Sequence, residues 1–316
     1  MNKKILIFDT SIATQNLGDL IILDSVKNSL EKMFPYGRFF NTATHEVIGM
    51  ASYKLCKNSD FAFVAGTNLL SSNMNSYNQW KVNFYDAAFL KNIILMGVGW
   101  WQYQNGVNLY TKLLYRRLLN NKFLHSVRDN YTKEKLSDAG VYNCINTGCP
   151  TTWSLTPQHC EDIPKLKSDS VVFTLTDYKK DHTKDSKLIR YLSENYETIY
   201  FWPQGSGDLE YLESFPCDVE VVAPSLKAFD FILTNSKSID YVGTRLHAGI
   251  RALQHKRRTI IIGVDNRAAE IAKDIELPFL TREEIDGLDD MINGKWATLL
   301  SIDFDAIETW RSQFIQ

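Results

Sequence analysis

Short apolar runs alternate with longer amphipathic segments along the whole chain. The apolar runs are continuous instead of alternating with polar residues, which is typical of parallel strands covered on both faces. In the first half they predict strands over residues 5–8, 61–65, 93–97 and 123–127. The segments between them space their apolar residues as a helix does, and they predict helices over 20–33, 46–56, 107–120 and 130–139.

The same alternation restarts after a polar stretch at residues 150–168, where three prolines indicate a linker. Beyond it, strands are predicted over 171–175, 198–202, 219–222, 239–242 and 259–262. Helices are predicted over 184–195, 226–235, 246–254 and 268–274, with a short last helix over 304–314. The sequence therefore predicts an α/β protein with two Rossmann-like doubly wound domains, residues 1–155 and 165–316, that face a central cleft.

The composition agrees with two globular domains and argues against a general nucleic-acid-binding protein. A chain of 316 residues has room for two domains of about 150 residues each. It carries 35 Lys and Arg against 37 Asp and Glu, a formal net charge of −2. A general nucleic-acid binder would carry a strong basic excess, so no nucleic-acid partner is expected.

The chain shows no sign of membrane insertion or export. It contains no run of about 18 apolar residues, and only four apolar residues precede Asp9, which is too short for a secretory signal. Five cysteines occur without a CxxC pair, so we expect reduced thiols in the cytoplasm and neither disulfides nor a metal site.

Unusual residues follow several predicted strands, where ligands bind in sheets of this kind. Asn16, Gly18 and Asp19 follow the first strand, and Asp19 can also cap the next helix. Arg128 and Asp129 follow the strand at 123–127, where a local ion pair at the start of a helix is the simpler interpretation. Gly205-Ser206-Gly207 follows another strand and could cradle a phosphate, although the turn lacks the spacing and lysine of a P-loop.

The segment Gly243-Thr244-Arg245-Leu246-His247 points more strongly to function. An arginine and a histidine stand two residues apart at a strand-to-helix turn, beside the positive end of the helix. Such a pair of cations is unfavourable without an anion, so we predict an anion site at Arg245 and His247. Arg267, after the next strand, adds a third cation.

Two further features allow both a structural and a functional interpretation. Trp100, Trp101 and Tyr103 could form a platform for a sugar ring, but an aromatic cluster is more often part of the core. Basic residues concentrate at 112–135 and 245–258, where a solvated helix face is the simpler interpretation. The functional alternative is a docking face for pyrophosphate-linked or membrane-anchored molecules.

Four segments, taken in order, resemble the polysaccharide pyruvyl transferase family over residues 1–280. They are Asn16-x-Gly18-Asp19, Val127-Arg128-Asp129 with the following helix and Gly140, Thr147-Gly148-Cys149-Pro150, and Arg245-Leu246-His247 leading into Gly249-Ile250-Arg251-Ala252. Two segments depart from the family pattern. Ala65-Gly66-Thr67-Asn68 replaces a glycine-rich turn, and Asp265-Asn266-Arg267 stands where the family often has Asp-x-Lys.

The resemblance implies a GT-B-like fold and the transfer of pyruvate from phosphoenolpyruvate onto two hydroxyls of a sugar, giving a cyclic ketal. No metal or nucleotide cofactor is implied. The acceptor would be a cell-surface glycan or a lipid-linked oligosaccharide, met in the cytoplasm or at the inner face of the membrane through a peripheral contact.

By analogy with the family, each candidate residue takes a role in that reaction. His247 would protonate the methylene carbon, and Asp19 or Asp129 would accept hydroxyl protons. The donor would be held by Arg128, Arg245, Leu246, Arg267, Gly205 and Ser206. The acceptor would be held by Asn16, Gly18, Trp100 and Trp101.

Two other functions are open at this point. A GT-B glycosyltransferase would use a nucleotide sugar in place of phosphoenolpyruvate, and the Gly205–Asp208 turn fits either donor. A non-catalytic glycan-binding protein could keep the fold alone.

Overall fold

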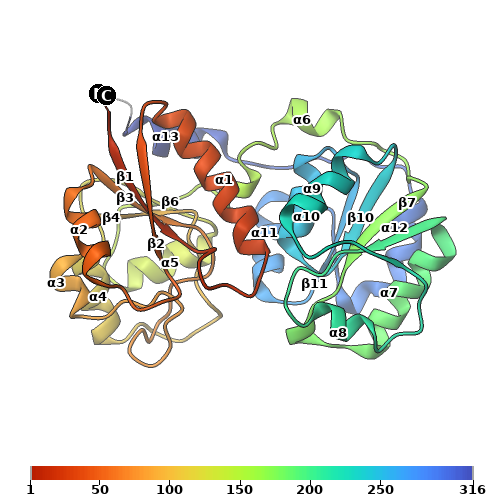
Figure 1. Cartoon of the computed structure of the whole chain (residues 1–316), viewed down its shortest axis with the longest axis horizontal. Helices are drawn as coiled ribbons and strands as arrows, with labels where there is room; N and C mark the ends of the chain where they lie inside the picture. The colour runs from red at the N-terminus through yellow and green to blue at the C-terminus, as the bar shows by residue number, and fades with distance from the viewer. Residues whose placement is uncertain (1, 315–316) are drawn as a thin grey trace. The chain divides into compact units, whose positions relative to one another are not determined.

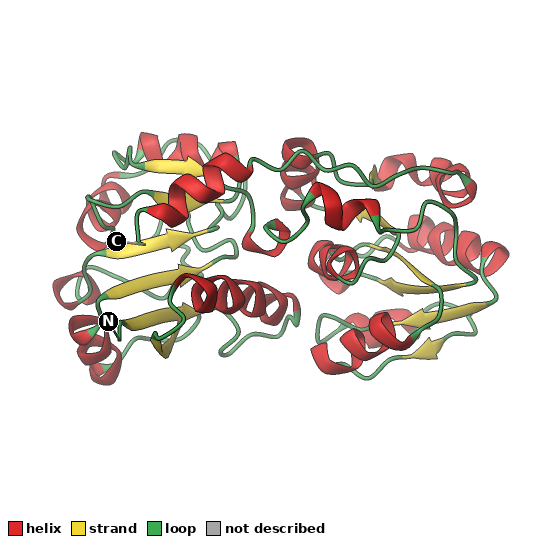
Figure 2. Ribbon diagram, turned by 90° about the horizontal axis from the view of Figure 1, so that it is seen from above, coloured by secondary structure: helices red, strands yellow, loops and turns green. Residues whose placement is uncertain are grey.

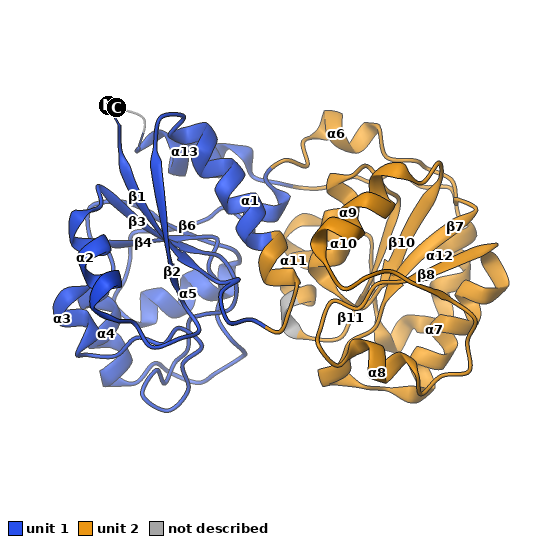
Figure 3. Ribbon diagram, viewed as in Figure 1, with its two compact units in different colours: residues 1–14, 22–153, 302–316 blue, residues 15–21, 154–301 orange. Residues whose placement is uncertain are grey.

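The computed structural model describes residues 2–314, and for Asn266 and Arg267 it describes the backbone only. The chain divides into two compact units (Figure 3). Unit 1 contains residues 1–14, 22–153 and 302–316, and unit 2 contains residues 15–21 and 154–301. Each unit has a parallel sheet with helices on both faces (Figure 2).

Unit 1 is built on a sheet of strand order β2-β1-β3-β4, next to a two-stranded sheet β5-β6. Gly97 N donates to Ser126 O at 3.0 Å, which links the end of β4 to β5. The strands are β1 (Lys4–Asp9), β2 (Arg38–Ala43), β3 (Phe61–Ala65), β4 (Ile93–Met96), β5 (His125–Val127) and β6 (Cys144–Asn146). The helices are α1 (Gly18–Met33), α2 (Met50–Asn58), α3 (Asp86–Phe89), α4 (Leu109–Leu118), α5 (Asn130–Asp138) and α13 (Phe304–Ser312), with a 3₁₀ turn at Pro150–Thr152.

Successive side chains of β1 point to opposite faces of this sheet and enter separate cores. Ile5 and Ile7 pack with residues of α1 and α13, whereas Leu6 and Phe8 pack with residues of α2, α4 and α5. All four side chains are fully buried, which explains the continuous apolar run in the sequence.

Unit 2 has a six-stranded parallel sheet of order β12-β11-β10-β7-β8-β9 (Figure 1). Its strands are β7 (Ser170–Thr174), β8 (Thr198–Phe201), β9 (Glu220–Val221), β10 (Ile239–Gly243), β11 (Thr259–Gly263) and β12 (Phe279–Thr281). Its helices are α6 (Pro157–Glu161), α7 (His182–Asn195), α8 (Asp208–Leu212), α9 (Leu226–Asn235), α10 (Leu246–Gln254), α11 (Asn266–Ile275) and α12 (Leu288–Asn293), with 3₁₀ turns at Asp177–Lys179 and Arg282–Gly287.

The structure confirms the predicted fold class. It assigns two segments to a different unit from the one predicted. The terminal helix α13 belongs to unit 1, because Ile307, Trp310 and Phe314 complete the core beside α1. Residues 15–21, predicted in the first domain, belong to unit 2. The predicted linker at 150–168 contains the short helix α6.

Three strands absent from the sequence prediction, β2, β6 and β12, lie at sheet edges. Their side chains are mostly half-buried or exposed, so their sequences do not show the continuous apolar run of the central strands.

The start of α1 also differs from the prediction. The helix begins at Gly18, so Asp19 lies in its first turn instead of preceding it. The polar side chain that bonds to the start of the helix is Asn16, whose Oδ1 accepts from Gly18 N at 3.0 Å.

Among residues 2–314, no helix is long and apolar enough to cross a membrane.

His125 on β5 is enclosed in unit 1 as a neutral side chain. Its Nδ1 accepts from Leu95 N at 3.1 Å, so Nε2 carries the proton and donates to Asn120 O at 2.8 Å. Burial, only partly offset by the bond to the Asn120 carbonyl, lowers the pKa of His125 to about 4.

We therefore expect the free energy of unfolding to fall as the pH is lowered from about 6.5 to 4, because the unfolded chain takes up a proton that the folded chain excludes. The expected loss is about 3 kcal/mol, at about 1.4 kcal/mol per pH unit. Urea unfolding of the wild type and of His125→Gln at pH 7 and pH 4.5 measures it. The variant should lose this part of the pH dependence, and an unchanged slope would contradict the assignment.

Candidate functional site

The candidate residues in the C-terminal half of the chain follow β8, β10 and β11, whose carboxyl ends lie close together in the sheet on either side of β7. From β7 the chain continues to β8 and β9 on one side, and later to β10, β11 and β12 on the other. The loops after β7 and β10 therefore meet at the topological switch point, where ligands bind in doubly wound sheets.

Arg245 lies at this point, directly before α10, with a buried side chain. Its Nε donates to Asp208 Oδ2 and to Leu175 O, each at 3.0 Å. Its Nη2 donates to Asp177 Oδ1 at 2.8 Å and makes a short ion pair with Asp208 Oδ1. Burial alone would lower the pKa of Arg245, but the charge and hydrogen bonds of Asp208 outweigh it and raise the pKa above its usual value. The anion expected beside Arg245 is thus supplied by the protein's own carboxylates.

The Asp208 carboxylate also accepts hydrogen bonds from the turn that was expected to bind a phosphate. It is fully buried and accepts from Gln204 N at 3.1 Å, Gly205 N at 2.7 Å and Asp177 N at 3.1 Å. Ser206 N donates to Gln15 O at 3.1 Å. The N–H groups of Gly205 and Ser206 thus have acceptors within unit 2, and the donor-binding role of these two residues stays a prediction.

The glycine at position 205 is required by this close packing. A Cβ there would overlap Arg245 Nη2 and would lie 3.1 Å from Asp208 Oδ1. Any larger residue would push the guanidinium away from its carboxylates.

A small pocket of about 20 Å³ adjoins the ion pair, with room for about one water-sized group. His247, the second residue of α10, lines it with Leu246 and is only 6% exposed. Gln204 Oε1 is buried there with no hydrogen-bond partner among the described residues. An imidazole and a buried amide oxygen, that of Gln204, therefore line the same pocket at the switch point. Its other lining residues are Asn16, Tyr178, Thr244, Arg245, Asp265 and Ala268.

Two helices begin at this pocket and present their positive ends to it. At α10, the residue in the N-cap position is Arg245, and its side chain forms no capping hydrogen bond within the described part of unit 2. At α11, Asp265 Oδ1 accepts from Ala268 N at 3.2 Å, and its Oδ2 accepts from Tyr178 Oη at 3.1 Å. Helix N-termini favour negative charge, so the setting suits a small anion or a developing negative charge.

Asn16 and Gly18 lie beside this pocket and not in the unit expected to bind the acceptor. Asn16 Oδ1 accepts from Gln204 Nε2 at 2.8 Å, and Leu17 N donates to Gln204 O at 2.9 Å. Asp19 follows in the first turn of α1 and is 6% exposed. The early motif is therefore part of unit 2 at Gln204, which the sequence order had not suggested.

In unit 1, Arg128 and Asp129 form the local ion pair that the sequence favoured. Arg128 Nε lies 3.2 Å from Asp129 Oδ2, and Asp129 Oδ1 accepts from Thr132 N at 2.7 Å as the cap of α5. A Cβ at Gly99 would lie 2.5 Å from Asn68 Oδ1 and 2.6 Å from Arg128 Cζ, so only glycine fits between them. Arg128, Asp129, Gly99 and Asn68 thus pack together in unit 1, and a donor-binding role for Arg128 stays a prediction.

The aromatic platform is corrected in part. Trp100 is 1% exposed and packs in the unit 1 core, edge-on to Tyr115, so it cannot stack on a sugar. Trp101 is half-buried and stacks on Tyr77 with a centroid distance of 3.6 Å.

Arg267 falls in the first turn of α11, but its side chain lies outside the described residues. Asp177 is a site residue that the sequence prediction missed. Its signal was its position two residues after the strand at 171–175, the same criterion that selected the other candidates.

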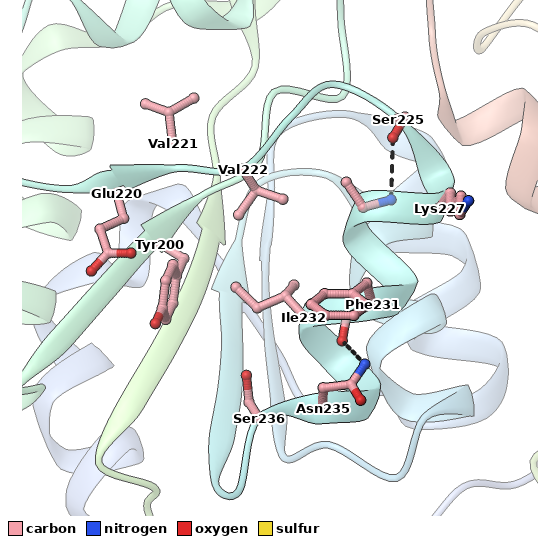
Figure 4. A pocket seen from close by; sticks show the side chains of 11 residues that line it. Tyr200, Glu220, Val221, Val222, Ser225, Lys227, Phe231, Ile232, Asn235 and Ser236 are labelled. Atoms are coloured by element: carbon pink, nitrogen blue, oxygen red, sulfur yellow. Dashed lines mark hydrogen bonds between the residues drawn. The ribbon is translucent and has the colours of Figure 1, made fainter.

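A second pocket of about 620 Å³ lies elsewhere in unit 2, between β8, β9 and α9 (Figure 4). Val221, Val222, Phe231 and Ile232 make it largely apolar, and the side chain of Ser225 is occupied by capping Ala228 N. None of the candidate residues lines it. Within the described part of the chain, no three His, Cys, Asp or Glu side chains gather as a metal site would require.

We expect Asp208→Asn to lower the free energy of unfolding by about 3 kcal/mol, because the amide loses the charge that pairs with the buried guanidinium of Arg245 and cannot accept all the hydrogen bonds that the carboxylate accepts. Urea unfolding of the full chain measures the loss. Asp177→Asn is the matched control and should cost less, because the Asp177 side chain is 25% exposed. Equal losses in the two variants would show that Asp208 is not the dominant partner of Arg245.

Comparisons with known proteins agree with this architecture. The family model for polysaccharide pyruvyl transferase matches residues 16–266. A solved structure titled "S. aureus MnaA-UDP co-structure" is similar with a TM-score of 0.50 and 12% identity, covering 93% of this chain and 91% of that one. That likeness concerns the fold alone, which is GT-B-like. No curated protein sequence matches. Because the family model covers most of its length, the chain belongs to the polysaccharide pyruvyl transferase family.

Proposed function

We propose that this protein transfers pyruvate from phosphoenolpyruvate onto two hydroxyls of one sugar, forming a cyclic ketal in cell-surface or capsular polysaccharide synthesis. The family supports a transferase that moves pyruvyl groups in polysaccharide synthesis. The observation that carries the proposal is His247, buried at the start of α10 beside the switch point of unit 2. An imidazole in this position can deliver a proton to a small anionic substrate held at the helix ends.

The charges around Arg245 indicate which groups would hold the donor. Arg245 meets two carboxylates, so these three residues together carry one negative charge and supply no attraction for an anion. We therefore assign Arg245 to ordering the loops after β7 and β8. Attraction for phosphoenolpyruvate would come from protonated His247, from the N-termini of α10 and α11, and from Arg267.

The reaction begins when protonated His247 transfers its proton to C3 of phosphoenolpyruvate, which leaves C2 electrophilic. One sugar hydroxyl attacks C2 and loses its proton. The bond between C2 and the phosphate oxygen then breaks, the second hydroxyl attacks C2, and its proton is lost. The products are the ketal and inorganic phosphate. Asp19 or Asp129 would accept hydroxyl protons, and no metal or cofactor enters these steps.

The acceptor would be a sugar or a lipid-linked oligosaccharide. We propose that the protein works in the cytoplasm and meets this acceptor at the inner face of the membrane.

His247→Gln tests the proton transfer. Glutamine keeps a hydrogen-bond donor but cannot deliver a proton, so phosphoenolpyruvate binding should survive while turnover falls by about a hundredfold or more. In deuterated water the wild-type product should carry one deuterium in its methyl group, as mass spectrometry would show. The control is His255→Gln at the far end of the same helix, where His255 pairs with Asp230. Near-normal turnover of His247→Gln would make His247 an anion ligand only.

Thermal stabilisation tests the donor. Phosphoenolpyruvate at about 100 times its dissociation constant should stabilise the protein by about 2.7 kcal/mol, whereas uridine and guanosine nucleotides should not. Arg267→Ala should weaken phosphoenolpyruvate binding by about 10- to 100-fold in calorimetry, and Lys273→Ala in the last turn of α11 is the control. Stabilisation by nucleotides alone would favour a nucleotide-sugar glycosyltransferase. Glycan binding without turnover would favour a non-catalytic member.

A further inference from the structure

Helices α2, α3 and α4 of unit 1, with the residues just before α3, expose several large apolar side chains to solvent. Six of them are well exposed: Met50, Phe84, Tyr85, Phe89, Leu109 and Leu113. Leu109 and Leu113 stand one turn apart on α4 and are 71% and 46% exposed. We call these residues, with the basic residues among them, the α2–α4 surface.

The three helices lie on the same side of the sheet (Figure 1), since residues of all three pack in the same core cluster. Phe89 of α3 stacks on Tyr53 of α2 with a centroid distance of 5.0 Å. Phe84, before α3, packs edge-on to Tyr110 of α4 at 4.8 Å. Arg117 Nε of α4 also donates to Ala87 O of α3 at 2.9 Å. Phe84 and Phe89 therefore pack against side chains of α4 and α2 and are not isolated on the surface, which is the arrangement expected of a binding surface.

The charges of this surface have one sign. Segments 50–58, 81–91 and 109–118 contain the basic residues Lys54, Lys57, Lys81, Lys91, Lys112, Arg116 and Arg117. Their one acidic residue, Asp86, is buried and accepts from Tyr53 Oη at 2.6 Å and Asn83 N at 2.8 Å. The chain as a whole has a net charge of −2, so this basic excess is local.

We propose that the α2–α4 surface docks on an anionic phospholipid bilayer. Phe, Tyr and Leu side chains can enter the boundary between headgroups and acyl chains, while lysine and arginine reach anionic headgroups. Charge complementarity favours this partner, since cations without exposed acids attract a negatively charged membrane. The inference rests on the proposed function only for the choice of the inner membrane face.

Vesicle co-flotation of the full chain, without donor or acceptor, tests the docking and is independent of the chemistry. The protein should float with vesicles of phosphatidylcholine and phosphatidylglycerol, and much less with phosphatidylcholine alone. Binding should weaken as salt rises. Arg116→Gln should weaken it by about fivefold and the double variant Leu109→Ser, Leu113→Ser by about tenfold or more.

Matched controls lie in unit 2. Leu299→Ser removes an equally exposed leucine (73%), and Lys227→Gln removes a basic residue from α9. Both should bind vesicles as the wild type does. The proposal is overturned by absence of flotation, by equal loss in controls and variants, or by a dimer in light scattering that the double leucine variant abolishes. The last result would assign the surface to a second copy of the chain.

Discussion

The buried carboxylate of Asp208 is the interaction on which the candidate site depends. It receives the guanidinium of Arg245 and three backbone N–H groups from the loops after β7 and β8. A buried carboxylate must be compensated in this way, because an unpaired charge in a protein interior costs several kcal/mol. These bonds link the loops that follow the neighbouring strands β7, β8 and β10, and His247 lies in the first turn of α10, where it lines the pocket.

This arrangement changes what an arginine at a strand end means. A guanidinium near a helix N-terminus predicts an external anion only if the protein supplies none. Here Asp177 and Asp208 supply two, and the arginine becomes part of the framework. The pocket beside this ion pair is lined by His247 and by Gln204, whose Oε1 has no hydrogen-bond partner among the described residues, and α10 and α11 begin there. These groups suit a small substrate that carries negative charge and exchanges protons.

Most central elements of the fold followed from periodicity alone. Strands such as β1, β3 and β10 are buried on both faces, and continuous apolar runs are the direct consequence. Edge strands such as β2 were not predicted, because the free edge of the sheet allows exposed polar residues such as Arg38 and Asn41. At the site, position after a strand identified Arg245, His247 and Asn16, but position could not tell a ligand-binding side chain from one that serves packing, as Trp100 shows.

The sequence by itself determined the alternation of strands and helices, the α/β class and the family, since these depend on local patterns and short motifs. Only the tertiary structure decided which side chains pair. In the structure α13 belongs to unit 1, where Trp310 packs beside Trp153. Asn16 bonds to Gln204, which is 188 residues away in the chain. The tertiary structure also gave Arg245 its carboxylates, 37 and 68 residues away. Pairings of this kind depend on how the chain returns to the same strand ends, and no local pattern in the sequence records that.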